Sequence, residues 1–150
     1  MPNTPLLLGC GATALCRSKN INDDDFNIVN NIFNSCGETF ILPEDKMNTI
    51  ISVNSSSPAY IYLLAKAMLD YSVNNGIDYE TSIAIICKTF YGCAKMIKNS
   101  GQSIDKLIDM VTSPGGTTIE AIKSLNDSNF SNIIKKAMDE CTKRANELAK

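Results

Sequence analysis

Apolar residues recur every three or four positions along most of the chain, and this spacing predicts helices. The predicted helices cover residues 23–36, 43–53, 58–75, 79–99, 103–111, 118–126 and 131–150. Residues 1–17 lack this spacing and are punctuated by prolines and glycines, so we expect an extended or loop-like segment there. Residues 39–42 are compatible with one short strand, and no pattern of parallel strands is visible. The predicted fold class is therefore all-α.

The predicted helices at residues 58–75 and 79–99 are apolar around nearly their whole circumference. Their apolar side chains include Ala59, Ile61, Leu63, Leu64, Ala65, Ala67, Met68, Leu69, Val73, Ile83, Ile85, Ile86, Cys87, Phe90, Cys93, Ala94, Met96 and Ile97. A helix that is apolar on all sides is normally buried on all sides. Two adjacent helices of this kind are more than a single chain of 150 residues hides comfortably, so the pattern favours an oligomer.

Composition and charge narrow the possible functions. The chain has 150 residues, a mass of 16.3 kDa and a formal net charge of -2. This size is typical of one domain, and without a basic cluster we expect no nucleic-acid partner. The absence of histidine excludes Ser-His and Cys-His nucleophiles and histidine-containing zinc sites. We recognise no signal peptide and no apolar stretch of the ~20 residues that span a bilayer, so we expect a cytoplasmic protein without membrane contact.

Six cysteines occur in the chain, and none forms a C-x-x-C pair. They are Cys10, Cys16, Cys36, Cys87, Cys93 and Cys141. Most lie within apolar runs, so we interpret them as reduced, buried side chains with a hydrophobic role. A disulfide framework or a metal cluster is the alternative, although the site we predict contains no metal.

Residues 9–14 read Gly-Cys-Gly-Ala-Thr-Ala and fit the G-x-G-x-x-A pattern of dinucleotide-binding loops. That fingerprint requires a strand–helix–strand unit with an acidic residue about 20 positions further on. Here Asp23, Asp24 and Asp25 come earlier and open a predicted helix. We therefore predict no Rossmann domain in this chain.

Residues 112–118, Thr-Ser-Pro-Gly-Gly-Thr-Thr, form the segment best suited to carry chemistry. The proline restricts one backbone angle, and the two glycines free those that follow. Thr117 and Glu120 fit a capping box at the start of the next helix. A glycine-rich turn before a helix amino terminus binds small anions such as carboxylates through its backbone N–H groups. The alternative is a tight connection between two helices, in which Thr117 acts only as a cap.

Four segments share both sequence and spacing with one known family. They read Asp109-x-Val111-Thr112-Ser113-Pro114-Gly115-Gly116-Thr117-Thr118-Ile119, Met1-Pro2-Asn3-Thr4-Pro5 with Gly11-Ala12-Thr13-Ala14-Leu15, Ser57-Pro58-Ala59-Tyr60, and Gly92-Cys93-Ala94-Lys95-Met96. Together they resemble pyrroline-5-carboxylate reductase along the whole chain. The resemblance covers the helical, C-terminal half of the family protein, and it implies that the N-terminal nucleotide-binding half is missing here.

The resemblance implies an oxidoreductase of proline biosynthesis. In that family, hydride from NADPH or NADH reduces the C=N bond of 1-pyrroline-5-carboxylate and gives L-proline. The implied fold is an interleaved helical bundle of about six to seven helices that forms a homodimer or a higher oligomer. Residues 1–17 would be a linker, and residues 18–150 the dimerisation and substrate-binding domain. The chain alone is expected to bind the imino acid or proline, to hold no NADP or NAD, and to be inactive without the missing half.

Carried over residue by residue, the resemblance implies a site in the loop. The substrate carboxylate would be received by the Ser113 hydroxyl and by the amides of Gly115, Gly116 and Thr117. The Thr118 hydroxyl would be the catalytic group, close to the ring nitrogen. A protonated imine is already an electrophile, so hydride transfer needs orientation more than a strong acid. A chain without histidine is able to serve that chemistry.

Asn3 and Thr4 are implied to border the nicotinamide ring of the cofactor. Two departures from the family pattern bear on the pocket more than on the fold. Ser55-Ser56-Ser57 stand where the family usually has Gly-Ser-Gly, and Met110 replaces a usual polar residue. The alternative function is a non-catalytic helical dimerisation or interaction module that has lost the cofactor domain.

Overall fold

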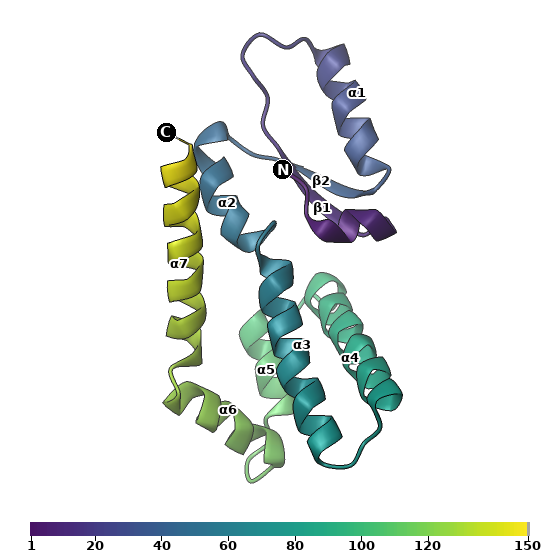
Figure 1. The fold of residues 1–150 in the computed structure, drawn as a ribbon, viewed down its shortest axis with the longest axis vertical. Helices are drawn as coiled ribbons and strands as arrows, with labels where there is room; N and C mark the ends of the chain where they lie inside the picture. Colours follow the sequence, from purple (N-terminus) through teal and green to yellow (C-terminus); the bar gives the residue numbers. More distant parts are fainter. Residues whose placement is uncertain (150) are drawn as a thin grey trace. The chain divides into compact units, whose positions relative to one another are not determined.

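The computed structural model of the chain describes residues 1–149 and is largely helical (Figure 1). Its elements in chain order are η1 (Thr4–Leu8), β1 (Gly11–Leu15), α1 (Asp23–Asn34), β2 (Gly37–Ile41), η2 (Glu44–Lys46), α2 (Met47–Val53), α3 (Ser57–Asn74), α4 (Tyr79–Asn99), α5 (Ile104–Val111), α6 (Thr117–Asp127) and α7 (Phe130–Leu148). The predicted helical class is confirmed, and one small two-stranded sheet accompanies the helices in the described part. Lys150, the end of the last predicted helix, lies outside the described residues.

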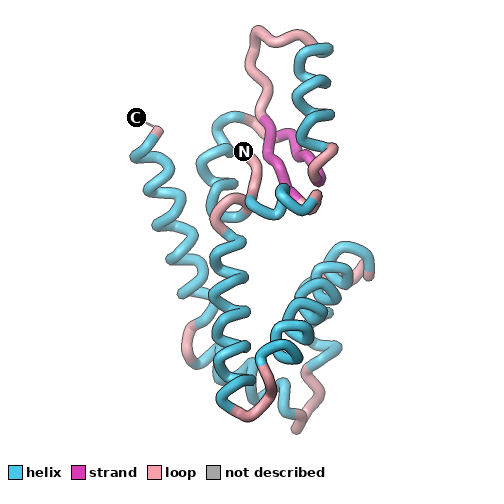
Figure 2. Tube along the Cα trace, turned by 45° about the vertical axis from the view of Figure 1, so that its right-hand side comes forward, coloured by secondary structure: helices cyan, strands magenta, loops and turns pink. Residues whose placement is uncertain are grey.

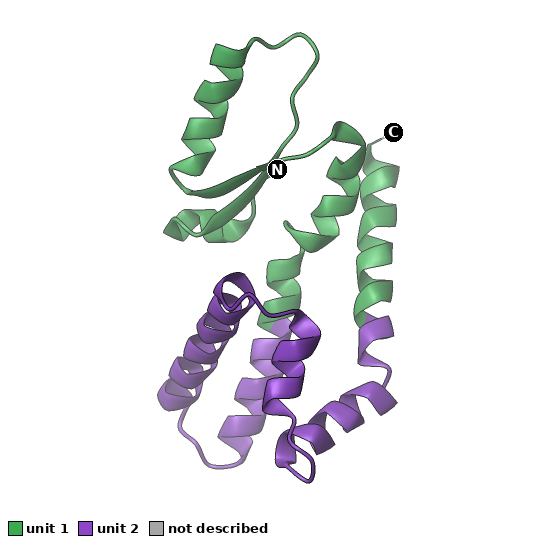
Figure 3. Cartoon of the chain, turned by 180° about the vertical axis from the view of Figure 1, so that it is seen from behind, with its two compact units in different colours: residues 1–62, 134–150 green, residues 63–133 purple. Residues whose placement is uncertain are grey.

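The chain divides into two units, which Figure 3 shows in different colours. The first unit comprises residues 1–62 and 134–150, and the second comprises residues 63–133. The long helices α3 and α7 each contribute residues to both units. The loop at residues 112–118 therefore belongs to the second unit, whereas the N-terminal segment belongs to the first.

Strands β1 and β2 of the first unit pair in parallel, with Gly11 opposite Gly37 and Leu15 opposite Ile41. Helix α1 supplies the crossover that a parallel pair requires, and Figure 2 shows the strands in magenta. The prediction that no parallel strands occur is therefore wrong. Its cause lies in the short strands, because β1 reads Gly-Ala-Thr-Ala-Leu and has little of the β-branched composition typical of strands.

Glycines explain how these two strands begin side by side. A Cβ atom on Gly37, which has a φ of +154°, would collide with the carbonyl oxygen of Gly11. The G-x-G-x-x-A pattern at residues 9–14 is placed differently from a dinucleotide-binding loop. Gly9 caps η1 and Gly11 opens β1, so the glycines precede a strand. A dinucleotide-binding loop places them after the strand and before a helix.

Helix α1 begins at Asp23 because the side chain of Asn22 caps it. The Asn22 Oδ1 atom accepts a hydrogen bond of 2.8 Å from the amide of Asp25. Asp23, Asp24 and Asp25 fill the first turn, where the helix dipole favours negative charge. The helix ends at Asn34, slightly earlier than predicted, because the chain turns there into β2.

Polar contacts join α2, the start of α3 and the end of α7 within the first unit. The Asn48 Nδ2 atom donates to Asn146 Oδ1 at 2.9 Å. The Ser56 hydroxyl and the Cys141 thiol lie 3.1 Å apart. Ser55, Ser56 and Ser57, which stand where the resemblance implies Gly-Ser-Gly, adopt no left-handed backbone, because Asn129 is the one non-glycine residue with positive φ in the described chain.

Helices α3 and α4 form an antiparallel pair in the second unit, joined by a short turn. Gly76 ends α3 with a φ of +87°, as predicted. Asp78 caps α4 through a 2.9 Å hydrogen bond from the amide of Thr81. The hydroxyls of Ser72 and Ser82 lie 2.7 Å apart and bond the two helices directly.

Few side chains of the second unit are buried. Within the described residues 63–133, Ser82 and Ile86 are the two buried positions. Large apolar side chains stay exposed along both long helices, namely Ile61, Tyr62, Leu63, Leu64, Met68, Tyr71, Val73, Tyr79, Ile85, Tyr91, Met96 and Ile97. The single chain thus leaves uncovered the apolar surface from which the sequence predicts an oligomer.

All six cysteines are free thiols, as interpreted from the sequence. Their predicted burial is wrong for the single chain. Cys10, Cys87 and Cys93 are exposed, and the other three are half-buried. The reason is that α4, which carries Cys87 and Cys93, turns much of its apolar surface to solvent.

Candidate functional site

The loop at residues 112–118 begins where α5 ends. The Thr112 hydroxyl donates to the carbonyl of Ile108 at 2.9 Å, and the Thr112 amide donates to the carbonyl of Asp109 at 3.2 Å. Both groups of Thr112 are therefore used to close the end of α5. Ser113 is therefore the first loop residue whose side chain is not hydrogen-bonded to the end of α5.

Residues 113–116 form a tight turn. The amide of Gly116 donates to the carbonyl of Ser113 at 3.0 Å, with Pro114 and Gly115 between them. Gly115 has a φ of +73°, which lies in the left-handed region that favours glycine. Proline second and left-handed glycine third are typical of a type II turn. The sequence Ser-Pro-Gly-Gly thus encodes this turn directly.

The turn leads into α6 without a side-chain cap. Gly116 is the N-cap residue, and no side chain bonds the first turn of the helix there. The predicted capping box is therefore wrong. The helix begins at Thr117, so Glu120 lies four positions after the cap instead of the three that a capping box requires.

The first backbone N–H groups of a helix have no partner within the helix. In α6 these groups belong to Thr117 and the residues that follow it, and Gly116 has no side chain that could accept from them. Ser113, Gly115, Thr117 and Thr118 are exposed, and Gly116 is half-buried. The structure thus brings the five predicted loop residues together around an open, uncapped helix amino terminus. Such an arrangement is able to bind a small anion.

Asn3 and Thr4, predicted to border a nicotinamide ring, lie in the first unit. Asn3 is the N-cap residue of η1, and its Oδ1 atom accepts a 2.9 Å hydrogen bond from the amide of Ala12. Thr4 is the first residue of η1 and is exposed. The Asn3 side chain is thereby fixed against β1, while the Thr4 side chain faces solvent.

An apolar groove precedes the loop in the second unit. It has a volume of about 290 Å³ and is lined by residues of α4 and α5, namely Cys93, Met96, Ile97, Ile104, Leu107, Ile108, Met110 and Val111. Met110, which stands where the resemblance implies a polar residue, is one of these lining residues. The substitution therefore adds to the apolar surface beside the loop.

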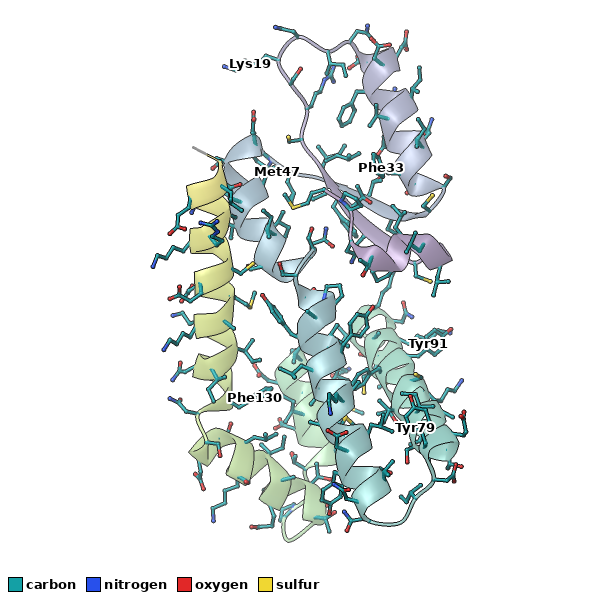
Figure 4. All side chains as sticks on the ribbon, viewed as in Figure 1. Lys19, Phe33, Met47, Tyr79, Tyr91 and Phe130 are labelled. Carbon is teal, nitrogen blue, oxygen red and sulfur yellow. The ribbon has the colours of Figure 1, made fainter. Side chains whose placement is uncertain are left out.

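Two polar clusters outside the loop were not predicted from the sequence. In the first, the Tyr60 phenol lies beside Cys141 and Ser56, and its partial burial and hydrogen bonding to Cys141 raise the pKa of Tyr60. In the second, Lys88 and Lys95 place their ammonium groups 5.4 and 4.8 Å from the Tyr91 ring centroid. Figure 4 labels Tyr91 on α4. Spacing along α4 indicates the second cluster, whereas the first joins residues too distant in sequence to be paired by pattern.

Two other kinds of feature are absent from residues 1–149. No group of three or more cysteine, aspartate or glutamate side chains is placed to hold a metal ion. None of the described helices combines the length and apolar character needed to cross a membrane.

A family model described as pyrroline-5-carboxylate reductase dimerisation matches residues 44–148. The chain belongs to the pyrroline-5-carboxylate reductase family. The matched range includes α2 to α7 and the whole of the loop. The match to a dimerisation domain also means that self-association is the family role of this part of the chain.

Curated relatives and solved structures agree with this assignment. The pyrroline-5-carboxylate reductases of Escherichia coli and Glycine max are 35% and 34% identical over 150 and 149 residues, which is 100% and 99% of this chain. The chain spans 56% and 54% of their lengths.

Among solved structures, the Plasmodium falciparum pyrroline carboxylate reductase with NADP bound superposes with a TM-score of 0.96 at 34% identity. It is covered over 62% of its length, and all of this chain is matched. The Streptococcus pyogenes 1-pyrroline-5-carboxylate reductase gives a TM-score of 0.93 at 32% identity, over 97% of this chain and 56% of that one.

Proposed function

We propose that this chain is the C-terminal domain of a pyrroline-5-carboxylate reductase, which reduces 1-pyrroline-5-carboxylate to L-proline with NAD(P)H. The chain supplies dimerisation and the loop that binds the substrate carboxylate. One observation carries the proposal: in a chain of this family, a type II turn at Ser113–Gly116 opens onto an uncapped helix amino terminus. A carboxylate would satisfy these free N–H groups, for which residues 1–149 supply no side-chain cap.

In this proposal the loop residues divide the work of holding the substrate. The Ser113 hydroxyl and the amides of Gly115 and Thr117 donate to the two carboxylate oxygens. The Gly116 amide already donates to the Ser113 carbonyl, so it reaches the carboxylate only as a shared donor. Hydrogen bonds to a carboxylate are stronger than neutral ones, so a few donors suffice to fix the ring.

The Thr118 hydroxyl is proposed to lie beside the ring nitrogen, in the first turn of α6. A protonated imine accepts hydride without a strong protein acid, so the site has to orient the ring and exclude misaligned approaches. A neutral hydroxyl suits this place, because it accepts the N–H of the imine or product without adding charge.

The cofactor that supplies the hydride is NADPH or NADH, which is proposed to bind mainly outside this chain. Two residues fit a border to its nicotinamide. The Asn3 side chain is held rigid by the Ala12 amide, and the Thr4 side chain is exposed next to it in sequence. Substituting Thr4 is therefore expected to change cofactor affinity more than stability.

Reconstitution tests the proposal. The chain is fused behind the nucleotide-binding half of the Escherichia coli relative, which is 35% identical to it. Oxidation of NADPH and NADH with 1-pyrroline-5-carboxylate is then followed by absorbance. We expect turnover from the fusion and none from the chain alone. A fusion with native circular dichroism and native oligomeric mass that stays inactive contradicts the proposal and favours a non-catalytic interaction module.

A further inference from the structure

Two adjacent glycines in the loop are glycine for different physical reasons. Gly115 has a φ of +73°, and nothing lies within 4 Å of the position of a Cβ there, so its backbone angle alone excludes other residues. Gly116 has a φ of -80° and a ψ of 167°, which any residue adopts without strain. The φ and ψ angles of residue 116 therefore do not require glycine there.

The reason at Gly116 lies in Ser113, whose hydroxyl makes the shorter of two close contacts and whose carbonyl oxygen makes the other. A Cβ atom on Gly116 would lie 2.8 Å from the Ser113 Oγ atom and 3.1 Å from the Ser113 carbonyl oxygen. A carbon atom does not approach an oxygen to 2.8 Å without displacing it. The Ser113 hydroxyl thus occupies the space that a side chain on the N-cap residue of α6 would fill.

We infer that Gly116 is a positioning residue, whose missing side chain holds open the place of the Ser113 hydroxyl at the head of α6. This inference rests on the proposed function, in which that hydroxyl donates to the substrate carboxylate. Gly116 acts through Ser113, in addition to closing the turn with its own amide. A serine at position 116, which would cap an ordinary helix well, is therefore expected to impair this one.

A double-mutant cycle with L-proline as the probe tests the inference on the full 150-residue chain. The variants are G116A, S113A and S113A/G116A, and affinity is measured by NMR titration of the labelled chain. Loss of one charge-assisted hydrogen bond weakens binding about tenfold. We expect S113A and G116A each to weaken proline binding about tenfold, and the double variant to be no weaker than S113A alone.

Gly115 provides the matched control, because its alanine variant strains the backbone without touching Ser113. G116A and S113A are expected not to be additive. Pyrrolidine is the control ligand, because it lacks the carboxylate. The substitutions at Ser113 and Gly116 should not change its affinity. Additive effects of G116A and S113A would overturn the inference, because Gly116 would then act independently of the Ser113 hydroxyl.

A second readout separates this inference from the proposed function. Scalar couplings in the free chain report the χ1 rotamer of Ser113 without any ligand. We expect one rotamer in the wild-type chain and a different or mixed rotamer in G116A, with G115A unchanged. If wild-type binds no proline, the proposed function fails, and the rotamers still decide the role of Gly116. An unchanged Ser113 rotamer in G116A contradicts the inference even where proline binds.

Discussion

At the scale of single residues, a pair of hydroxyls carries part of the stability of the second unit. Ser82 is 2% exposed, and its Oγ atom lies 2.7 Å from Ser72 Oγ across the α3–α4 pair. A buried hydroxyl without a hydrogen-bond partner destabilises the fold more than an apolar side chain at the same position, because the hydroxyl has lost its hydrogen bond to water. The two serines therefore stabilise the helix pair as a matched set.

We predict that Ser82→Ala lowers the free energy of unfolding by about 1 kcal/mol, because Ser72 loses its partner. The double variant Ser72→Ala/Ser82→Ala should recover part of this loss, since neither hydroxyl is then left alone. Urea unfolding of the wild-type chain and the variants measures both values. Equal losses in the single and double variants would show that an unpaired Ser72 hydroxyl carries no penalty, which contradicts the matched-pair account.

The loop shows how far residue-level patterns reach. The Ser-Pro-Gly-Gly sequence predicts a turn before a helix, and the structure has one, because proline and left-handed glycine leave the backbone little choice. The predicted cap at Thr117 is wrong, because Gly116 already occupies the N-cap position. The close approach of the Ser113 hydroxyl to position 116 could not be predicted from the sequence, because it depends on distances between atoms in the folded chain.

At the scale of elements, α4 depends on its N-cap residue, Asp78. The Asp78 side chain accepts the amide of Thr81, and this hydrogen bond lowers the pKa of Asp78 below its ordinary value of 3.8. A lowered folded-state pKa means that the charged cap stabilises the helix above pH 3.8 and that this contribution is lost as the pH falls below it.

We predict that the thermal midpoint of the wild-type chain falls more steeply between about pH 5 and about pH 3 than that of Asp78→Asn. Asparagine keeps an acceptor for Thr81 but does not titrate, so it serves as the matched control. Asp78→Ala should lower the midpoint throughout this range, because the cap is absent at every pH. Identical pH slopes for wild type and Asp78→Asn would contradict the assignment.

Patterns predict the helices of this chain well and the strands poorly. The predicted bounds of α4, residues 79–99, agree with the structure because Asp78 caps the start and the apolar spacing runs unbroken to the end. The β1–β2 pair was missed because each strand has five residues, and β1 is built mostly from glycine and alanine. Its pairing depends on the contact between Gly11 and Gly37, which are distant in sequence.

At the scale of the whole molecule, the exposed apolar side chains of α3 and α4 indicate an interface with another chain. Leu63 and Tyr71 on α3 are 70% and 72% exposed, and Ile97 on α4 is 55% exposed. Apolar side chains exposed in this number along two helices are typical of an interaction surface. The family match to a dimerisation domain identifies the partner as a second copy of the chain.

We predict that Ile97→Glu, in the groove between α4 and α5, weakens self-association at least about tenfold. A carboxylate buried without a partner costs well above the ~1.4 kcal/mol that corresponds to tenfold. Lys19→Glu, at an exposed loop position between β1 and α1 in the first unit, is the control and should leave the dimer intact. Sedimentation equilibrium measures the dimer dissociation constant of each variant. Equal dissociation constants would show that the second copy of the chain does not cover this groove.

The most direct test of the account is the molar mass of the chain in solution, measured by light scattering on a sizing column. A dimerisation domain with uncovered α3 and α4 predicts about 33 kDa, twice the 16.3 kDa of the chain. That result would place the apolar faces of both helices in an interface and justify the proline titrations. A stable, folded species of 16.3 kDa would contradict the account. The exposed side chains of α3 and α4 would then have no partner, and the site proposed from the family would lose its support.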